Sequence, residues 1–213
     1  MTPEHASELT AKTCLLAPVI PVLVLDDASK AEGLARALIA GGLPALEVTL
    51  RTPAALEAIA EMAKVEGGVV GAGTLITPAD VEAAKKAGAT FGVSPGSTKL
   101  LLEACEANDL PLLPGAATAT EAMALLERGY RTMKFFPAEA AGGAKALGSL
   151  ASPLPQIKFC PTGGISLKNA GDYLSLPNTL CVGGSWVAPK EMIAGEDWEG
   201  ITALAAEAAA LPR

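Results

Sequence analysis

The sequence predicts an α/β fold, a single-domain (β/α)8 barrel over residues 1–213 with an extra N-terminal helix. Three observations favour it. Short apolar runs alternate with helix-start signals, one run about every 20 to 26 residues, which is the length of one strand–helix unit. There are eight such runs. Pairs of glycines follow the last two runs, where barrels often hold a phosphate.

An open, doubly wound sheet is the alternative architecture. That fold usually has fewer strands and carries a glycine-rich loop after the first one. Here the first apolar run is followed by Asp26, Asp27, Ala28 and Ser29, without a glycine. The barrel is therefore preferred, and no linker or low-complexity segment suggests a second domain.

The predicted strands are runs rich in Val, Ile, Leu and Phe that are bounded by turn residues. In chain order they are 19–25, 45–50, 69–75, 91–94, 110–114, 132–136, 156–160 and 180–182.

Helix starts are predicted where a threonine can accept a hydrogen bond from a free backbone N–H. Thr52 and Thr77 are each followed by proline, and Thr118 begins a capping box with Glu121. Further helices are predicted from Ser166 onward and over residues 3–17 and 197–211.

Charge and residue usage exclude several functional classes. The chain has 16 Lys and Arg against 23 Asp and Glu, a net charge of −7, which argues against nucleic acid as a partner. The only histidine is His5, near the chain end, so we expect no histidine-ligated metal. The four cysteines are scattered without a C-x-x-C, which indicates buried reduced thiols in a cytoplasmic protein.

One apolar segment resembles a signal-peptide core but is not expected to act as one. Residues 14–25 are interrupted by Pro18 and Pro21, and the stretch before them is not basic. No apolar run approaches the roughly 20 residues of a membrane span. We therefore expect neither export nor a membrane partner.

The second predicted strand carries charged residues on one face. With a period of two, Glu47, Thr49 and Arg51 point into the barrel while the leucines and valine between them point toward the helices. A carboxylate facing a barrel interior is costly unless it is paired or useful. Glu47 is therefore a candidate catalytic group, and the alternative is a structural Glu47–Arg51 ion pair.

Lone lysines interrupt two other apolar strands. Burial disfavours the charged ammonium, and a neutral amine is a nucleophile toward carbonyl carbons. Lys134 and Lys158 both meet this description, and their surroundings in the sequence do not separate them. The alternative for either is a lysine whose ammonium reaches solvent at a strand end.

Glycine pairs and rim residues suggest substrate contacts. Gly163-Gly164 and Gly183-Gly184-Ser185 follow the last two strands, where backbone N–H groups could bind a phosphate; tight turns without a ligand are the alternative. Thr74 ends the third strand and could offer a hydroxyl to a carboxylate. Pro95 follows the fourth strand, where a rigid turn at the barrel rim is the plainer interpretation.

These motifs, taken together, resemble the 2-keto-3-deoxy-6-phosphogluconate aldolase family over nearly the whole chain. The segments that carry the resemblance are Leu46–Arg51, Gly71–Thr74, Ser94–Gly96, Lys134–Ala140, Phe159–Ile165 and Gly183–Trp186. The resemblance implies a class I, Schiff-base aldolase on a (β/α)8 barrel, usually a homotrimer and free of cofactors and metals.

The resemblance also implies residue roles and separates the two lysines. Lys134 matches the Schiff-base lysine, and Glu47 matches the general acid and base. The substrate-binding positions it implies are Arg51, Thr74 and Pro95 for the pyruvyl end and Gly163, Gly164, Gly184 and Ser185 for the phosphate. The implied reaction cleaves 2-keto-3-deoxy-6-phosphogluconate to pyruvate and D-glyceraldehyde 3-phosphate, with side activity on 4-hydroxy-2-oxoglutarate.

Three alternatives stay open at this point. One is an aldolase for the galactonate epimer of the substrate. Another is a metal-free phosphosugar isomerase or epimerase, which would use Glu47 as a base and form no covalent adduct. The third is a non-catalytic protein that binds a phosphorylated metabolite.

Overall fold

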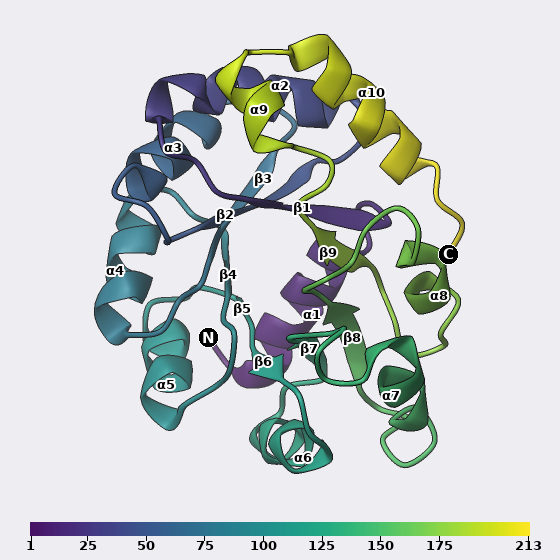
Figure 1. The fold of residues 1–213 in the computed structure, drawn as a ribbon. Helices are drawn as coiled ribbons and strands as arrows, with labels where there is room; N and C mark the ends of the chain where they lie inside the picture. The colour runs from purple at the N-terminus through teal and green to yellow at the C-terminus, as the bar shows by residue number, and fades with distance from the viewer.

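The computed structural model describes residues 1–213 and is a closed ring of parallel strands surrounded by helices (Figure 1). Six strands pair in the order β5-β4-β3-β2-β1-β9, and three more in the order β6-β7-β8. Their bounds are β1 Val19–Leu23, β2 Ala45–Thr49, β3 Val69–Gly73, β4 Phe91–Val93, β5 Leu112–Leu113, β6 Gly115–Ala116, β7 Thr132–Phe135, β8 Lys158–Pro161 and β9 Val182–Gly184.

Two features close this ring into a (β/α)8 barrel. Strands β5 and β6 are consecutive pieces of one strand, interrupted at Pro114, which has no backbone N–H to donate. Two isolated bridges, Phe159–Thr179 and Thr162–Gly183, connect the β8 and β9 segments. The fold class predicted from the sequence is confirmed, and all eight predicted strands are present with small shifts of their ends.

Helices cover the outside of the ring, and one lies across its amino end. The outer helices are α2 Ala31–Ala40, α3 Ala55–Met62, α4 Pro78–Lys86, α5 Lys99–Ala107, α6 Ala119–Arg128, α7 Gly143–Ser149, α8 Ala170–Leu174, α9 Lys190–Ala194 and α10 Trp198–Ala209, with a 3-10 turn η1 at Ala28–Lys30. None of them combines the length and apolar character that crossing a bilayer requires.

Helix α1 (Pro3–Cys14) is the predicted extra helix, and it lies behind the strands in Figure 1. The Ser7 hydroxyl accepts hydrogen bonds from the backbone N–H groups of Arg131 and Thr132, at 2.6 and 2.9 Å. This attaches α1 to the first residue of β7 and so covers the amino end of the barrel.

The hydrophobic core has two parts, because successive side chains of a strand point to opposite sides. Leu46 and Val48 of β2 belong to the large core between strands and helices. Each fully buried side chain of this kind contributes about 1.5–3 kcal/mol. A small inner core of eight residues fills part of the barrel: Cys14, Ile20, Ala45, Phe91, Val93, Leu113, Cys160 and Cys181. All four cysteines are buried and free, as predicted.

Two predicted helix starts are confirmed and two are wrong. Thr77 with Asp80 and Thr118 with Glu121 form capping boxes. Thr52 does not cap a helix, because its hydroxyl donates to the Leu25 carbonyl and α3 begins only at Ala55. The helix predicted from Ser166 begins only at Ala170, since turns occupy the residues between them.

Candidate active site

A buried lysine–glutamate pair lies inside the barrel. The Lys134 Nζ on β7 donates to the Glu47 Oε1 on β2 at 3.1 Å, and each side chain is only 3% exposed. The two strands are not neighbours in the sheet, so the side chains meet across the interior. A Cβ on Gly73 of β3 would lie 2.3 Å from the Glu47 Oε1, so only glycine leaves room for this carboxylate. The predicted catalytic candidates are thus in direct contact.

The structure separates the two candidate lysines by position. Lys158 is the first residue of β8, at the amino end of the barrel, and its amine donates to the Pro177 carbonyl at 2.7 Å. Lys134 is buried inside, with its Nζ 5.3 Å from the centre of the Phe136 ring. Only Lys134 therefore has its amine near a carboxylate that could take or return its proton.

Buried thiols lie close to the catalytic pair. Cys160 is the register partner of Lys134 on the neighbouring strand. Its hydrogen bond with Cys14 raises the pKa of the Cys14 thiol, and burial adds to this. The hydrogen bond with Cys14 likewise raises the pKa of the Cys181 thiol. Both thiols therefore stay neutral at physiological pH. The Cys160 thiol differs, because its hydrogen bonds with Cys14 and Cys181 lower its pKa, and the Lys134 ammonium lowers it further.

A cavity of about 170 Å³ adjoins this pair, because Phe136, whose ring centre is 5.3 Å from the Lys134 Nζ, and Val22, the register partner of Glu47, both line it. It is lined by Val22, Val24, Arg51, Phe136, Thr162, Gly163, Gly164, Ile165, Gly183, Gly184 and Ser185. Gly163 and Gly164 have φ of +104° and +77°, a backbone conformation that other residues rarely adopt. The backbone N–H groups of Gly163, Gly164 and Ile165 donate no hydrogen bond within the protein. Such free N–H groups in a concave turn favour an anion.

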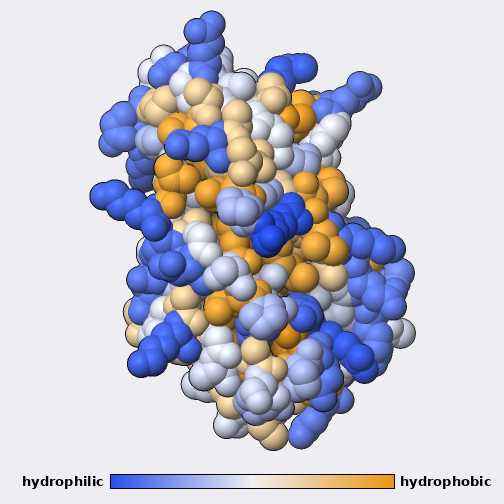
Figure 2. Space-filling model, turned by 90° about the vertical axis from the view of Figure 1, so that its right-hand side faces the viewer, coloured by the Kyte–Doolittle hydropathy of each residue, from blue (hydrophilic) through white to orange (hydrophobic).

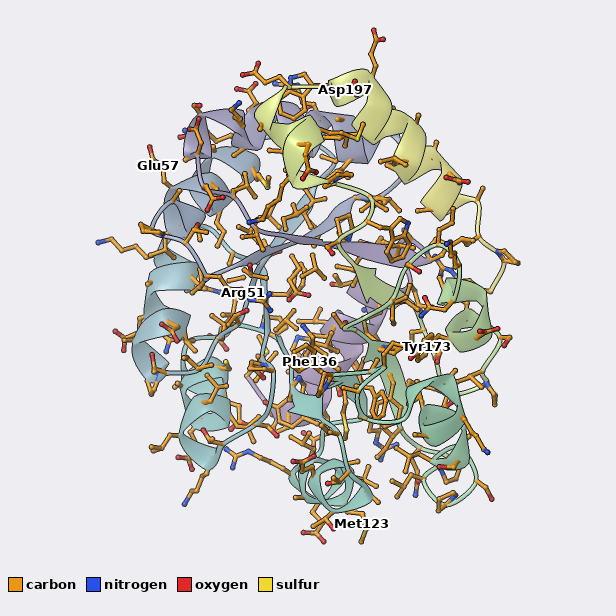
Figure 3. The ribbon with its side chains drawn as sticks, viewed as in Figure 1. Arg51, Glu57, Met123, Phe136, Tyr173 and Asp197 are labelled. Atoms are coloured by element: carbon orange, nitrogen blue, oxygen red, sulfur yellow. The ribbon has the colours of Figure 1, made fainter.

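Arg51 adds a charge to this cavity. Its Nε donates to the Thr74 Oγ1 at 3.1 Å, which leaves the rest of the guanidinium without a partner. Figure 3 places Arg51 and Phe136 at the centre of the barrel. Thr74 has φ of +62°, an uncommon conformation for a β-branched residue that costs on the order of 1–3 kcal/mol. Strain of this kind is typical of a functional site.

The ion pair considered as the structural alternative for Glu47 does not form. Glu47 contacts Lys134, and Arg51 contacts Thr74. Gly163, Gly164, Gly184 and Ser185 line the cavity with Arg51, as expected. The other predicted site residues, Glu47, Thr74, Pro95 and Lys134, do not line it. Thr74 reaches the cavity only through its hydrogen bond with Arg51, and Pro95 follows β4 with its carbonyl against Gly115.

Sequence reasoning missed several cavity residues. Val22 and Val24 alternate along and just beyond β1, so the period of two could have found them. Phe136 and Thr162 adjoin predicted site residues, but no pattern in the sequence separates them from residues of the core.

Comparisons with known proteins agree with this geometry. The family described as "Aldolase: KDPG and KHG aldolase" matches residues 10–204. The 2-dehydro-3-deoxy-phosphogluconate aldolases of Zymomonas mobilis and Dickeya dadantii are 53% and 50% identical to this chain. The alignments cover 93% of this chain and 94% of the first relative, and 91% of both chains for the second.

Solved structures agree as well. The crystal structure of the Zymomonas mobilis aldolase with 3-phosphoglycerate has a TM-score of 0.90 at 52% identity and covers 95% of both chains. The Legionella pneumophila KDPG aldolase, in which pyruvate is captured as a covalent carbinolamine, has a TM-score of 0.91 at 46% identity and covers 94% of this chain and 98% of that one. This chain therefore belongs to the KDPG and KHG aldolase family.

Proposed function

We propose that this protein is a class I aldolase that cleaves 2-keto-3-deoxy-6-phosphogluconate to pyruvate and D-glyceraldehyde 3-phosphate through a Schiff base on Lys134. We propose side activity on 4-hydroxy-2-oxoglutarate. The observation that carries the proposal is the buried 3.1 Å contact between the Lys134 Nζ and the Glu47 Oε1, beside a cavity with free backbone N–H groups.

The first half of the reaction forms the imine. Glu47 takes a proton from Lys134, which leaves a neutral amine that attacks the C2 ketone of the substrate. Glu47 returns a proton to the hydroxyl of the resulting carbinolamine, which departs as water. The product is a protonated imine, into which electrons from the adjacent C3–C4 bond can flow.

The second half breaks the carbon–carbon bond. Glu47 removes the proton of the C4 hydroxyl, the C3–C4 bond breaks, and the aldehyde leaves while the electron pair forms an enamine. Protonation of the enamine at C3 gives the pyruvate imine, and water hydrolyses it to release pyruvate and Lys134. One carboxylate in contact with the amine suffices for all these proton transfers.

The substrate has an anion at each end, and the cavity offers partners for both. We assign the carboxylate end to Arg51 and its partner Thr74, because the guanidinium has free donors, and to Pro95 on the strength of the family resemblance alone. We assign the phosphate to Gly163, Gly164, Gly184 and Ser185, since glycine-rich turns after the last strands hold phosphates in barrels.

Relatives support this choice of substrate. The Legionella protein holds pyruvate covalently, and the Zymomonas protein holds 3-phosphoglycerate, a phosphorylated acid. A structure named native KDPGal has a TM-score of 0.79 at 27% identity. The galactonate epimer is therefore the second candidate substrate, behind the gluconate.

We also propose a cofactor-free homotrimer that works in the cytoplasm, in the Entner–Doudoroff pathway, on the strength of the family resemblance. Large apolar side chains are available on the surface for subunit contacts: Leu15, Leu16, Leu56, Ile76, Leu100 and Met123. Apolar residues also show between polar ones on the side that carries α8 and the chain end (Figure 2). Size-exclusion chromatography with light scattering measures the molar mass of the assembly and so tests the trimer.

Borohydride reduction in the presence of pyruvate, followed by peptide mass spectrometry, tests the mechanism. We expect a reduced pyruvyl adduct on Lys134, its loss in Lys134→Arg, and its retention in the control Lys158→Arg. An adduct on Lys158 would keep the aldolase but overturn the residue assignment. No adduct on folded wild-type protein would overturn the imine mechanism and favour the isomerase.

A further inference from the structure

The chain segment that follows Lys134 is bonded to the phosphate-binding turn. Beyond β7, the backbone N–H of Ala138 donates to the Thr162 carbonyl at 2.8 Å, and that of Glu139 donates to the Gly163 carbonyl at 3.1 Å. The segment that follows the proposed nucleophile is thus hydrogen-bonded to the turn that would hold the phosphate.

The side chain of Glu139 lies between this turn and α8. A Cβ on Gly164 would lie 2.8 Å from the Glu139 Cβ and 2.7 Å from its Cγ, so the turn packs closely against Glu139. The Tyr173 hydroxyl, on α8, donates to the Glu139 Oε1. Tyr173 itself is only 1% exposed. Glu139 is exposed and has no other hydrogen bond or ion pair to its carboxylate, so the contact with Tyr173 is the one that holds the carboxylate against α8 instead of leaving it to solvent.

The orientation of this carboxylate matters because a phosphate is an anion. A carboxylate that turned toward Gly163 and Gly164 would repel it, and the turn would also lose its close packing. A second contact from the same region, from the Asn169 Nδ2 to the Gly164 carbonyl at 3.2 Å, holds the other side of the turn.

We propose that Tyr173 and Glu139 are positioning residues that hold the phosphate-binding turn at a set distance from the Lys134 amine. Tyr173 binds the carboxylate against α8, and Glu139 supports Gly164 from behind. This inference rests on the proposed function, since it assumes that the turn binds the phosphate of the substrate.

The chain supplies a matched control. Its only other tyrosine, Tyr130, is also buried and donates to a glutamate, the Glu106 Oε1, at 3.2 Å. This second pair lies at the opposite, amino end of the barrel. Tyr130→Phe therefore removes the same kind of hydrogen bond without reaching the site.

The test compares a phosphorylated with an unphosphorylated substrate. Tyr173→Phe should raise the KM for 2-keto-3-deoxy-6-phosphogluconate and the inhibition constant of inorganic phosphate about five- to tenfold, the size expected for the loss of one ordinary hydrogen bond. Its kcat/KM for 4-hydroxy-2-oxoglutarate should fall much less. Glu139→Gln keeps an acceptor for Tyr173 and removes the charge, so it should retain most of the preference for the phosphorylated over the unphosphorylated substrate. Tyr130→Phe should retain all of this preference.

Two results would overturn the inference. One is an equal loss on both substrates in Tyr173→Phe, which would indicate a merely structural role. The other is an unchanged affinity for phosphate. Failure of the proposed function is a separate result, because the wild-type protein would then trap no pyruvate. Even in that case, phosphorus NMR titration with inorganic phosphate would measure the phosphate affinity of the turn in the wild type and in Tyr173→Phe.

Discussion

The two ends of the barrel use similar groups in different ways. At the amino end, Glu106 accepts two hydrogen bonds from Arg128 at 2.9 Å each and one from Tyr130 at 3.2 Å. At the carboxyl end, Glu139 has only Tyr173, and Glu47 has only Lys134. Glu106 thus has three side-chain donors, whereas Glu139 and Glu47 have one each.

This difference shows where stability and chemistry lie in the molecule. A carboxylate with three donors can rearrange only at the cost of several hydrogen bonds, so it stabilises one conformation. A carboxylate with a single partner, such as Glu47 with Lys134, can exchange that partner for a substrate proton. Helix α1 covers the amino end of the barrel, where Glu106 lies, and the cavity opens at the carboxyl end.

The largest expected effect contrasts the two ends directly. Glu47→Gln should lower kcat by about 10²–10⁴-fold, since an amide cannot carry the protons of the reaction. The folded state should persist, as judged by circular dichroism. Steady-state kinetics on 2-keto-3-deoxy-6-phosphogluconate measures the loss, and a wild-type kcat would remove Glu47 from the mechanism.

Glu106→Gln is its counterpart at the amino end. It should leave kcat unchanged within about twofold and lower the free energy of unfolding by about 1–2 kcal/mol, because the ion pair with Arg128 weakens to neutral hydrogen bonds. A drop in kcat without a loss of stability would contradict the assignment of stability to the amino end and of chemistry to the carboxyl end.

The second effect tests how tightly the site is shaped. In Gly73→Ala the new Cβ would clash with the Glu47 Oε1 at 2.3 Å and displace the carboxylate from Lys134. A displacement near 1 Å can cost about 10²-fold in rate, which we expect in kcat. Gly171→Ala is the control, since nothing lies within 4 Å of its Cβ position, and it should leave kcat unchanged. Equal kinetics in both variants would contradict this account.

A third, smaller effect concerns stability at the amino end of the barrel. Arg128→Ala should lower the free energy of unfolding in urea by about 1–2 kcal/mol, because it leaves Glu106 half-buried with one partner. The matched surface pair is Arg36 with Glu32, both well exposed, and Arg36→Ala should cost only about 0.3–0.5 kcal/mol. Similar losses in the two variants would refute the proposed role of burial.

The smallest effect appears only at high pH. Burial, followed by the interaction with a glutamate, raises the pKa of both Tyr130 and Tyr173 above the value of about 10 in an unfolded chain. Unfolding therefore releases protons above pH ~10, so stability falls as the pH rises beyond that value. Absorbance at 295 nm should show little tyrosinate in the native protein at pH ~11 and about nine-tenths ionisation in urea. Ordinary titration of the native protein would contradict this.

Much of the fold could be predicted because it depends on neighbours in the chain. The period of two in β2 placed Glu47 inside the barrel and Leu46 and Val48 outside it. The helix starts at Thr77 and Thr118 were predicted correctly, because each depends on hydrogen bonds to residues within four positions in the chain. The glycine pairs do line a cavity, and their role in binding phosphate stays a prediction.

Tertiary structure alone decided the partners of these groups. Thr52 bonds to Leu25 instead of capping a helix, because the two residues meet only when the first and second strands pair. The residue pattern left Lys134 and Lys158 even, and only folding put one beside Glu47 and the other on a carbonyl at the far end. The bond from Tyr173 to Glu139 joins residues 34 positions apart. A sequence specifies which way a side chain points along its own strand, but the closure of the ring determines what it meets there.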